Sequence, residues 1–131
     1  MWQFSAAVCI NENNEILMVL QKGYQDQEKK WSVPSGRKKP NESFVECCIR
    51  ETYEETGYQV EVVKELYQKD IIAFNSPAPV KYYKVKIIGG KPTIHDPDDL
   101  IYDIKWISKE QLSTLELSFP EDRKTLLELL S

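Results

Sequence analysis

Apolar residues in the first third of the chain come in short runs that are separated by polar clusters. Trp2 to Ile10 and Ile16 to Leu20 are apolar, and the turn-forming residues Asn11 to Asn14 lie between them. Two apolar runs around such a cluster are typical of a β-hairpin. Gly23 to Lys30 is polar and is expected to be a loop, whereas Trp31 to Pro34 alternates like a strand. The sequence therefore predicts mainly β-structure up to residue 34.

The spacing of buried positions changes to that of a helix at Ser43. The pattern continues to Thr56, and Gly57 follows directly as a helix stop. The side chains expected to face a sheet are those of Val45, Cys48, Ile49, Thr52 and Thr56. The sequence therefore predicts one amphipathic helix over residues 43–56, entered through a loop at residues 34–36.

Strand-like sequence resumes after this helix. Val60 to Phe74 and Val80 to Ile88 are rich in residues that favour strands, and Ile101 to Ile107 is a further short candidate. Asn75 to Pro79 contains two prolines and is expected to be a loop. Three further strands are therefore predicted between residues 60 and 107.

Two more helices are expected near the end of the chain. Ser108 to Gln111 looks like a helix start, and Ser118 to Leu130 like a second helix with Pro120 in its first turn. Leucines recur at helical spacing and are expected to form a core face, with a homodimer contact as the alternative: Leu126, Leu129 and Leu130. Several strands with one helix in mid-chain and helices at the end predict one mixed α/β domain over residues 1–131.

Composition and charge narrow the class of protein. Hydrophobic residues make up 41% of the chain and charged residues 29%, which is typical of a soluble globular protein. The net charge of −4 argues against nucleic acid as a bulk partner, since such binding needs many Lys and Arg on one face. No apolar run is long enough for a membrane span, and no basic region precedes the first apolar run. We therefore expect no membrane association and no secretory signal.

The cysteines point to a reducing compartment. They are Cys9, Cys47 and Cys48, an odd number with no CxxC spacing. This arrangement is typical neither of a disulfide framework nor of a zinc site. We expect three reduced core residues in a cytoplasmic protein.

Acidic residues are concentrated on one face of the mid-chain helix. At about 100° per residue, Glu51, Glu54 and Glu55 fall within an arc of roughly 100°. Like charges this close repel one another, and the end of a helix favours cations instead. Arg50 can pair with Glu46 or Glu54 but cannot neutralise the whole cluster. An oxygen-only ligand set without His or Cys suits Mg²⁺ or Mn²⁺.

A divalent ion on this face would suit phosphoryl chemistry. Such ions neutralise phosphate oxygens, orient a phosphate chain and acidify a bound water. Glutamate-rich helices are common, however, and a solvated acidic face is the more frequent explanation when the helix is considered alone. The residues around the helix decide between the two.

The spacing of these residues resembles the signature of the Nudix hydrolases, the family that includes the MutT-type enzymes. The pattern is Gly36, five residues, Glu42, seven residues and then Arg50-Glu51-x-x-Glu54-Glu55-x-Gly57. Residues on both sides also resemble the family, with Trp31-x-x-Pro34-Ser35-Gly36 before the motif and Trp106 before Ser108 and Glu110 after it. The resemblance covers nearly the whole chain. It implies the Nudix fold, an α/β/α sandwich with a mixed β-sheet.

The resemblance also implies a role for each motif residue. Glu51 and Glu55 would be the first metal ligands and Glu54 a third, with the backbone carbonyl of Ser35 completing an Mg²⁺ or Mn²⁺ site. Arg50 would orient Glu51. Glu42 would brace the loop by a charged hydrogen bond, and Gly36 and Gly57 would lie where the backbone turns sharply. The residues expected to carry the reaction are Arg50, Glu51, Glu54 and Glu55.

The reaction implied by the resemblance is hydrolysis of a nucleoside diphosphate linked to another group. Nucleoside triphosphates, nucleotide sugars and dinucleoside polyphosphates all meet this description. The general base stays open between a helix glutamate and an acidic residue of a later loop: Asp96, Asp98, Asp99 or Asp103. His95, the single histidine, is expected to be a bystander.

Two positions depart from the family pattern, and the loop is unusually basic. Thr52 and Tyr58 stand where the family usually has aliphatic residues, and both are expected to be half buried. The basic run at residues 37–39, Arg-Lys-Lys, could attract phosphates, but a solvated charge run is the favoured interpretation.

Substrate recognition is less defined by the sequence. Lys22, at the end of the second strand, is a candidate phosphate ligand. Five aromatic residues could stack on a base, although sheet packing is their more frequent role: Trp2, Phe4, Tyr24, Tyr82 and Tyr83. Two other functions are considered. A silent Nudix-fold nucleotide-binding or sensor module is disfavoured by the complete glutamate set, and a structural calcium helix by the lack of a loop of alternating Asp and Asn ligands.

Overall fold

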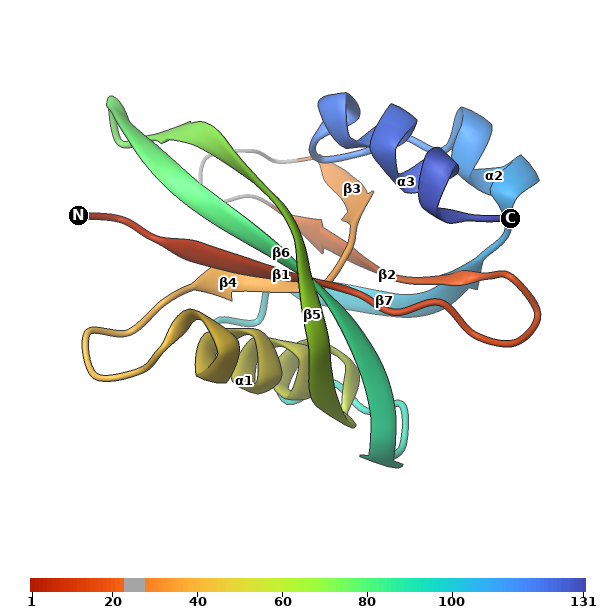
Figure 1. The fold of residues 1–131 in the computed structure, drawn as a ribbon, viewed down its shortest axis with the longest axis horizontal. Coiled ribbons are helices and arrows are strands. Elements are labelled where there is room, and N and C mark those ends of the chain that lie inside the picture. Colours follow the sequence, from red (N-terminus) through yellow and green to blue (C-terminus); the bar gives the residue numbers. More distant parts are fainter. Residues whose placement is uncertain (23–27) are drawn as a thin grey trace.

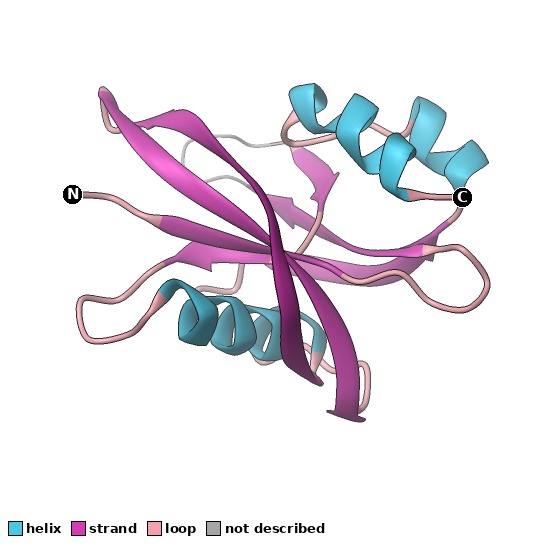
Figure 2. Ribbon diagram, viewed as in Figure 1, coloured by secondary structure: helices cyan, strands magenta, loops and turns pink. Residues whose placement is uncertain are grey.

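Two β-sheets lie between two helical layers in the computed structural model, which describes residues 1–22 and 28–131 (Figure 1). Helix α1 (Phe44–Thr56) lies on one side of the sheets, and α2 (Lys109–Thr114) and α3 (Arg123–Leu129) lie on the other (Figure 2). The strands are β1 (Phe4–Val8), β2 (Ile16–Lys22), β3 (Lys29–Ser32), β4 (Ser35–Arg37), β5 (Tyr58–Ala73), β6 (Ser76–Gly90) and β7 (Ile101–Ile107). The predicted α/β/α arrangement is confirmed. No helix of the described residues is long and apolar enough to cross a membrane.

The two sheets differ in how their strands pair. The larger sheet has the order β4-β1-β6-β5 and is mixed, because β1 and β6 run parallel while the other pairs are antiparallel. The smaller sheet has the order β3-β2-β7 and is antiparallel. The predicted mixed sheet is thus the larger of the two.

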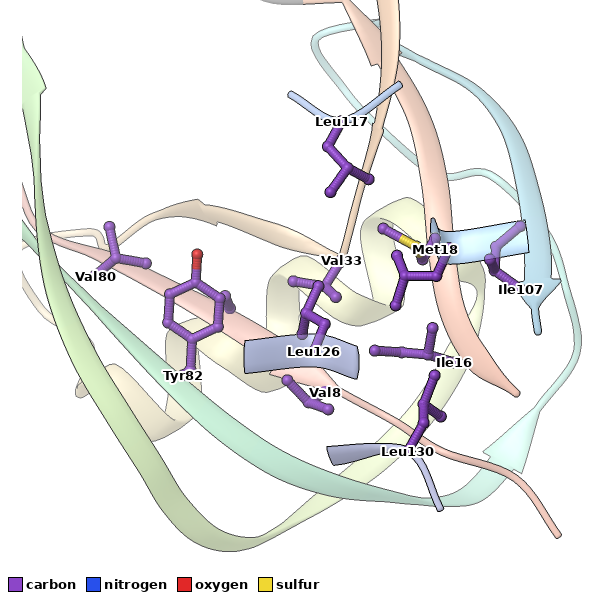
Figure 3. Packing of buried hydrophobic residues seen from close by; sticks show 12 residues of the cluster. Val8, Ile16, Met18, Val33, Val80, Tyr82, Ile107, Leu117, Leu126 and Leu130 are labelled. Atoms are coloured by element: carbon purple, nitrogen blue, oxygen red, sulfur yellow. The ribbon is translucent and has the colours of Figure 1, made fainter. Parts of the chain in front are cut away.

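Strand β1 is apolar except for Ser5, whose buried hydroxyl donates to the Phe44 carbonyl at 2.7 Å, because both faces of the strand are covered. Ala6 and Val8 belong to the core cluster that α2 and α3 share, which Figure 3 shows from close by. Ala7 and Cys9 belong to a second cluster, against α1. Successive side chains of a strand point to opposite faces, so a strand between two helical layers needs apolar residues at every position.

The predicted hairpin between the first two apolar runs is wrong. Strand β1 pairs with β4 and β6, and β2 pairs with β3 and β7 in the other sheet. Only a single bridge, between Ile10 and Ile16, joins the two segments. The Asn-rich turn therefore passes the chain from one sheet to the other.

The predicted loop from Asn75 to Pro79 is also wrong. The turn is confined to Phe74 and Asn75, which both have positive φ, and β6 begins at Ser76. Pro77 and Pro79 pair with β5, whereas β1 joins β6 only from Val80 onwards. The prolines therefore lie where β6 has a neighbour on one side alone, a position that tolerates a missing N–H.

Three further boundaries differ from the prediction. Lys29 and Lys30 belong to β3, and residues 23–27 of the predicted loop lie outside the described residues. The loop predicted at residues 34–36 is largely the short strand β4. The last helix begins at Arg123, after the 3-10 turn Pro120–Asp122, because the Ser118 N–H donates to the Trp31 carbonyl and keeps this segment extended. The predicted core face is confirmed for Leu126 and Leu130.

Candidate active site

Local hydrogen bonds define both ends of α1. The Ser43 hydroxyl accepts from the Glu46 N–H while the Glu46 carboxylate accepts from the Ser43 N–H, which is a capping box. At the other end Gly57 has a φ of 78° and its N–H donates to the Tyr53 carbonyl. Glu46 is therefore committed to the cap, and Arg50 pairs with Glu54 instead.

The face of α1 that contacts the sheet is more polar than a typical buried surface. Thr52 and Thr56 are fully buried, and each hydroxyl donates to the carbonyl four residues earlier, at 2.7 and 2.6 Å. These bonds satisfy the hydroxyls inside the helix, so threonine can replace an aliphatic residue there. Val45 was expected on this face but is 38% exposed, and Cys47 is buried instead.

Arg50 connects three carboxylates and a backbone carbonyl; we call this set the Arg50 network. Its guanidinium donates to Glu42 at 2.6 and 3.0 Å, to Glu51 at 2.8 Å and to Glu54 at 3.0 Å. A further bond of 2.9 Å goes to the Arg37 carbonyl. The hydrogen bonds from Arg50 lower the pKa of Glu42 to about 2.

Glu42 also contacts the backbone of its own loop, between β4 and α1. Its carboxylate accepts from the Lys39 N–H at 2.8 Å, in addition to its two bonds from Arg50. The carboxylate therefore connects the backbone between β4 and α1 to a side chain in the middle of the helix. A charge-assisted bond of this kind is stronger than one between neutral groups.

Glu51 and Glu55 form a carboxyl pair beside β4, in which Glu55 is buried and Glu51 is half-buried. Glu55 is 5% exposed and accepts from the Ser35 N–H at 3.1 Å. Burial raises the pKa of Glu55 well above its ordinary value, and the charge of Glu51 raises it further. Burial also raises the pKa of Glu51, against the opposing effect of Arg50. Ionisation of both carboxyl groups at once is therefore unfavourable unless a cation compensates their charge.

Gly36 leaves the space that the Glu51 carboxylate occupies. A Cβ atom at residue 36 would lie 2.1 Å from Glu51 Cδ, and Gly36 itself is part of β4 rather than of a sharp turn. The expected reason for this glycine is therefore wrong. Gly57 does have the expected left-handed conformation, and a Cβ there would also lie 2.2 Å from the Lys91 carbonyl oxygen.

The donor set around Glu51 and Glu55 fits a hard cation with two carboxylates rather than three. In the described part of the chain, no three His, Cys, Asp or Glu side chains form a group that could hold a metal ion. Glu54 is hydrogen-bonded to Arg50 at 3.0 Å. Glu51 and Glu55, whose pKa values are raised, would lose their mutual repulsion on binding a divalent ion.

A pocket of about 750 Å³ opens over these residues. Its acidic part is formed by Glu51, Glu54 and Glu55, and its apolar part includes Phe4, Ile71 and Phe119. Lys22 also lines it, as do residues 35–40 of β4 and the following loop. The pocket therefore combines an acidic region, basic side chains and an apolar wall.

The aromatic residues considered for stacking divide into two groups. Trp2, Phe4 and Tyr82 line the pocket, whereas Tyr83 packs in the cluster against α1. Tyr82 is buried, and its hydroxyl donates to Asp122 at 2.6 Å. Tyr24 lies outside the described residues.

Only some of the aspartates considered as the general base lie at the pocket. Asp96 and Asp98 line the pocket, whereas Asp99 and Asp103 do not. The Asp96 carboxylate accepts from the Leu100 N–H at 2.6 Å, and the charge of Asp96 raises the pKa of Glu55. His95 lies outside the pocket and stacks on Tyr53 at 5.0 Å between ring centroids.

Two features of the pocket were not found from the sequence. Phe119 is part of its apolar wall, and Arg37 stacks on Trp2. Phe119 lies between a segment paired with β3 and a 3-10 turn, so no periodicity marks it. The Trp2–Arg37 contact joins residues that are distant in the sequence, although the basic run was a signal for one of the two.

The chain belongs to the NUDIX family, because the family model described as NUDIX domain matches residues 1–130. Its fold is that of solved members: a NUDIX hydrolase from Nitrosomonas europaea superposes with a TM-score of 0.83 at 19% identity, over 96% of this chain and 85% of that one. The predicted Nudix fold is thus confirmed.

Two curated relatives carry names that point to different substrates, one to mRNA and one to 8-oxo-dGDP. The chain is 31% identical over 112 residues to the mRNA-decapping enzyme subunit 2 of Saccharomyces cerevisiae. The matched region covers 79% of this chain and 11% of that protein. It is 40% identical over 57 residues to the 8-oxo-dGDP phosphatase NUDT18 of Mus musculus, over 44% of this chain and 17% of that protein. The chain thus spans only a small part of either relative.

Proposed function

We propose that this protein is a metal-dependent pyrophosphohydrolase that cleaves a phosphoanhydride bond in a nucleoside diphosphate linked to another group. The observation that carries the proposal is the Glu51–Glu55 pair, in which Glu55 is 5% exposed and both side chains line the same pocket. Membership of the NUDIX family supports it, and one relative is named as a phosphatase of a nucleoside diphosphate.

Mg²⁺ or Mn²⁺ would be held by Glu51 and Glu55, with the Ser35 carbonyl as a backbone ligand and Glu54 as a third carboxylate once it leaves Arg50. Bound there, the ion would neutralise phosphate oxygens and lower the pKa of an attacking water. Arg50 orients Glu51 through their 2.8 Å bond. Gly36 has no side chain and so leaves space for the Glu51 carboxylate. Glu42 holds the neighbouring loop between β4 and α1 through its bond from the Lys39 N–H.

A carboxylate facing the pocket would accept the proton of the attacking water. Three candidates line the pocket: Glu54, Asp96 and Asp98. Asp96 accepts three backbone N–H bonds, which occupy lone pairs that a base needs. Glu54 and Asp98 are therefore the preferred candidates.

The proposed substrates are nucleoside triphosphates, nucleotide sugars or dinucleoside polyphosphates. Lys22 would contribute to phosphate binding, since it lines the pocket. We place the protein in the cytoplasm and expect no nucleic acid as a bulk partner. Three free, buried cysteines accord with that location.

The test is phosphate or nucleotide release from a panel of these substrates with Mg²⁺ or Mn²⁺. We expect turnover by the wild-type protein and a loss of about 10²- to 10³-fold in kcat/KM for Glu55→Gln, which keeps the shape of the side chain and removes its charge. Glu54→Gln tests whether Glu54 acts as a base or metal ligand, in which case activity falls, or serves only as a hydrogen-bond partner of Arg50, in which case activity is retained. Glu128→Gln, on the exposed surface of α3, is the matched control.

A wild-type protein that turned over nothing in the panel would leave a silent nucleotide-binding module as the explanation. Equal activity of Glu55→Gln and the wild type would remove the acidic pair from the reaction.

A further inference from the structure

The guanidinium of Arg37 makes a cation–π contact with the ring of Trp2 at the pocket. Its guanidinium carbon is 3.3 Å from the ring centroid of Trp2, and both residues line the same pocket as the Glu51–Glu55 pair. When a guanidinium stacks on an aromatic ring, its N–H bonds point outwards in the plane of the guanidinium, parallel to the ring. They can therefore still bind an anion. Arg37 is exposed, as expected for a solvated charge run, but its contact with Trp2 distinguishes it from a freely solvated side chain.

Trp2 is itself held in place. Phe74, in the turn between β5 and β6, stacks on the indole at 4.3 Å between ring centroids. A guanidinium and a phenyl ring so close to one ring cannot share a face, so both faces of Trp2 are covered. Trp2 is consequently not free to stack on a base. Its contacts serve to fix Arg37.

The backbone of Arg37 is fixed as well. Its carbonyl accepts from Arg50 at 2.9 Å, and the next residue, Lys38, donates its N–H to the Gln3 carbonyl at 2.7 Å. The ribbon shows the same closeness, with the N-terminus at the end of the sheets where β4 leads into α1 (Figure 1). These two hydrogen bonds fix the backbone at Arg37 and Lys38 without using the guanidinium donors of Arg37.

The two arginines of the site differ in their partners. Arg50 is bonded to three carboxylates, whereas the Arg37 guanidinium has no carboxylate partner among residues 1–22 and 28–131. The Arg50 guanidinium is thus bonded to the glutamates of the Arg50 network. The Arg37 guanidinium instead contacts Trp2, beside the acidic residues of the pocket, and its N–H donors are available to a ligand.

We propose that Arg37, positioned by Trp2, binds a phosphate group of the substrate next to the Glu51–Glu55 pair. The ligand class is a di- or triphosphate chain, since a phosphate can accept two parallel bonds from one guanidinium. The inference rests on the proposed function, because it assigns a binding role within the same pocket. Trp2 is a positioning residue that acts through Arg37.

The test combines equilibrium binding with kinetics. The binding probe is imidodiphosphate with Mg²⁺, whose P–N–P bridge resists hydrolysis, measured by calorimetry. We expect Arg37→Ala to weaken it about tenfold, and to raise KM for a nucleoside triphosphate about tenfold with kcat within about twofold. Lys124→Ala removes the same charge from the exposed surface of α3, and it should leave both values within about twofold.

Variants of Trp2 test the positioning role. Trp2→Ala should weaken the probe about threefold to fivefold, Trp2→Phe should restore most of the loss, and Arg37→Lys should fall between Arg37→Ala and the wild type, because an ammonium stacks less well. The double variant Trp2→Ala/Arg37→Ala should bind no worse than Arg37→Ala alone. Losses that simply add would overturn the positioning role.

The outcomes separate this inference from the proposed function. Arg37-dependent binding of imidodiphosphate without turnover of any substrate would support the inference and contradict the proposed function. Turnover with Arg37→Ala equal to Lys124→Ala in both measurements would overturn the inference and leave the proposed function intact.

Discussion

The Arg50 network and the Glu51–Glu55 pair are neighbours on α1 with opposite electrostatics. In the network, Glu42 receives two bonds from Arg50, and its pKa falls to about 2. In the pair, burial is the largest effect on both carboxyl groups and raises their pKa values. Interactions within the chain stabilise the ionised form of Glu42, whereas a bound cation would stabilise the ionised forms of Glu51 and Glu55.

The comparison separates stability from function within one helix. A satisfied charge network stabilises the native state, so its loss should be measured in unfolding. A buried pair of like charges costs stability and is the kind of arrangement that accumulates at functional sites. Glu51 belongs to both regions, through its bond from Arg50 and its contact with Glu55.

Among variants that leave the acidic side chains unchanged, the largest expected effect comes from displacing Glu51. In Gly36→Ala the new methyl group would lie 2.1 Å from Glu51 Cδ, so the carboxylate must move. We expect kcat/KM to fall about 100-fold, since a displacement of about 1 Å is enough for such a loss. The backbone of residue 36 accepts alanine, because it lies in a strand and has no left-handed φ.

Gly89→Ala is the matched control for this variant. It makes the same change at the far end of β6, where the new Cβ would meet only the flexible end of the Gln59 side chain, at 2.9 Å. Activity equal to that of the wild type in Gly36→Ala would contradict the assignment of Glu51 to the reaction.

The next effect concerns the Arg50 network. Glu42→Gln removes the charge that accepts two bonds from Arg50. We expect the free energy of unfolding in urea to fall by about 2 kcal/mol, the range of hydrogen bonds to charged groups. Glu128→Gln should change it by less than about 0.5 kcal/mol, because that side chain is exposed. Equal stability of the two variants would show that the network contributes nothing.

The pH dependence of stability sharpens the same comparison. The folded-state pKa of Glu42 is about 2 against an ordinary value of 4.5, so between these values the unfolded chain binds more protons. The stability that Glu42 confers is therefore fully present above pH 4.5 and is lost as the pH falls toward 2. Unfolding curves of the wild type and Glu42→Gln should differ most at neutral pH and converge in acid. A constant difference would contradict the lowered pKa.

Local sequence signals predicted α1 well because they act at short range. The helical periodicity from Ser43 and the stop at Gly57 lie within one segment, and the structure adds a capping box between Ser43 and Glu46 that was not predicted from the sequence. The hairpin failed because two apolar runs around a turn look the same whether their strands pair together or enter different sheets. That choice is made by β4, β6 and β7, which lie far along the chain.

The candidate site divides in the same way. The spacing of glutamates on one helix face is local, so Glu51 and Glu55 could be found from the sequence. The buried space at Gly36 and the stack of Arg37 on Trp2 depend on how β4 lies against α1 and the N-terminal residues. No spacing rule carries that information. Sequence therefore indicated the acidic half of the pocket better than its basic rim.

The smallest expected effect is a change in thiol reactivity beneath the Arg50 network. Burial raises the pKa of Cys47 to about 12 and that of Cys9 to about 11, so both thiols should react slowly with a disulfide reagent at pH 8. Cys47 lies 4.0 Å from Arg50 Nη2 and 3.5 Å from the Gly36 carbonyl, whereas Cys9 packs in the cluster against α1. Glu42→Gln should therefore speed the reaction of Cys47 several-fold, up to about tenfold for each 1.4 kcal/mol of local stability lost. Mass spectrometry after a short labelling pulse distinguishes the two sites. Equal acceleration at Cys9 would mean that Glu42 stabilises the whole fold rather than the region around the active site.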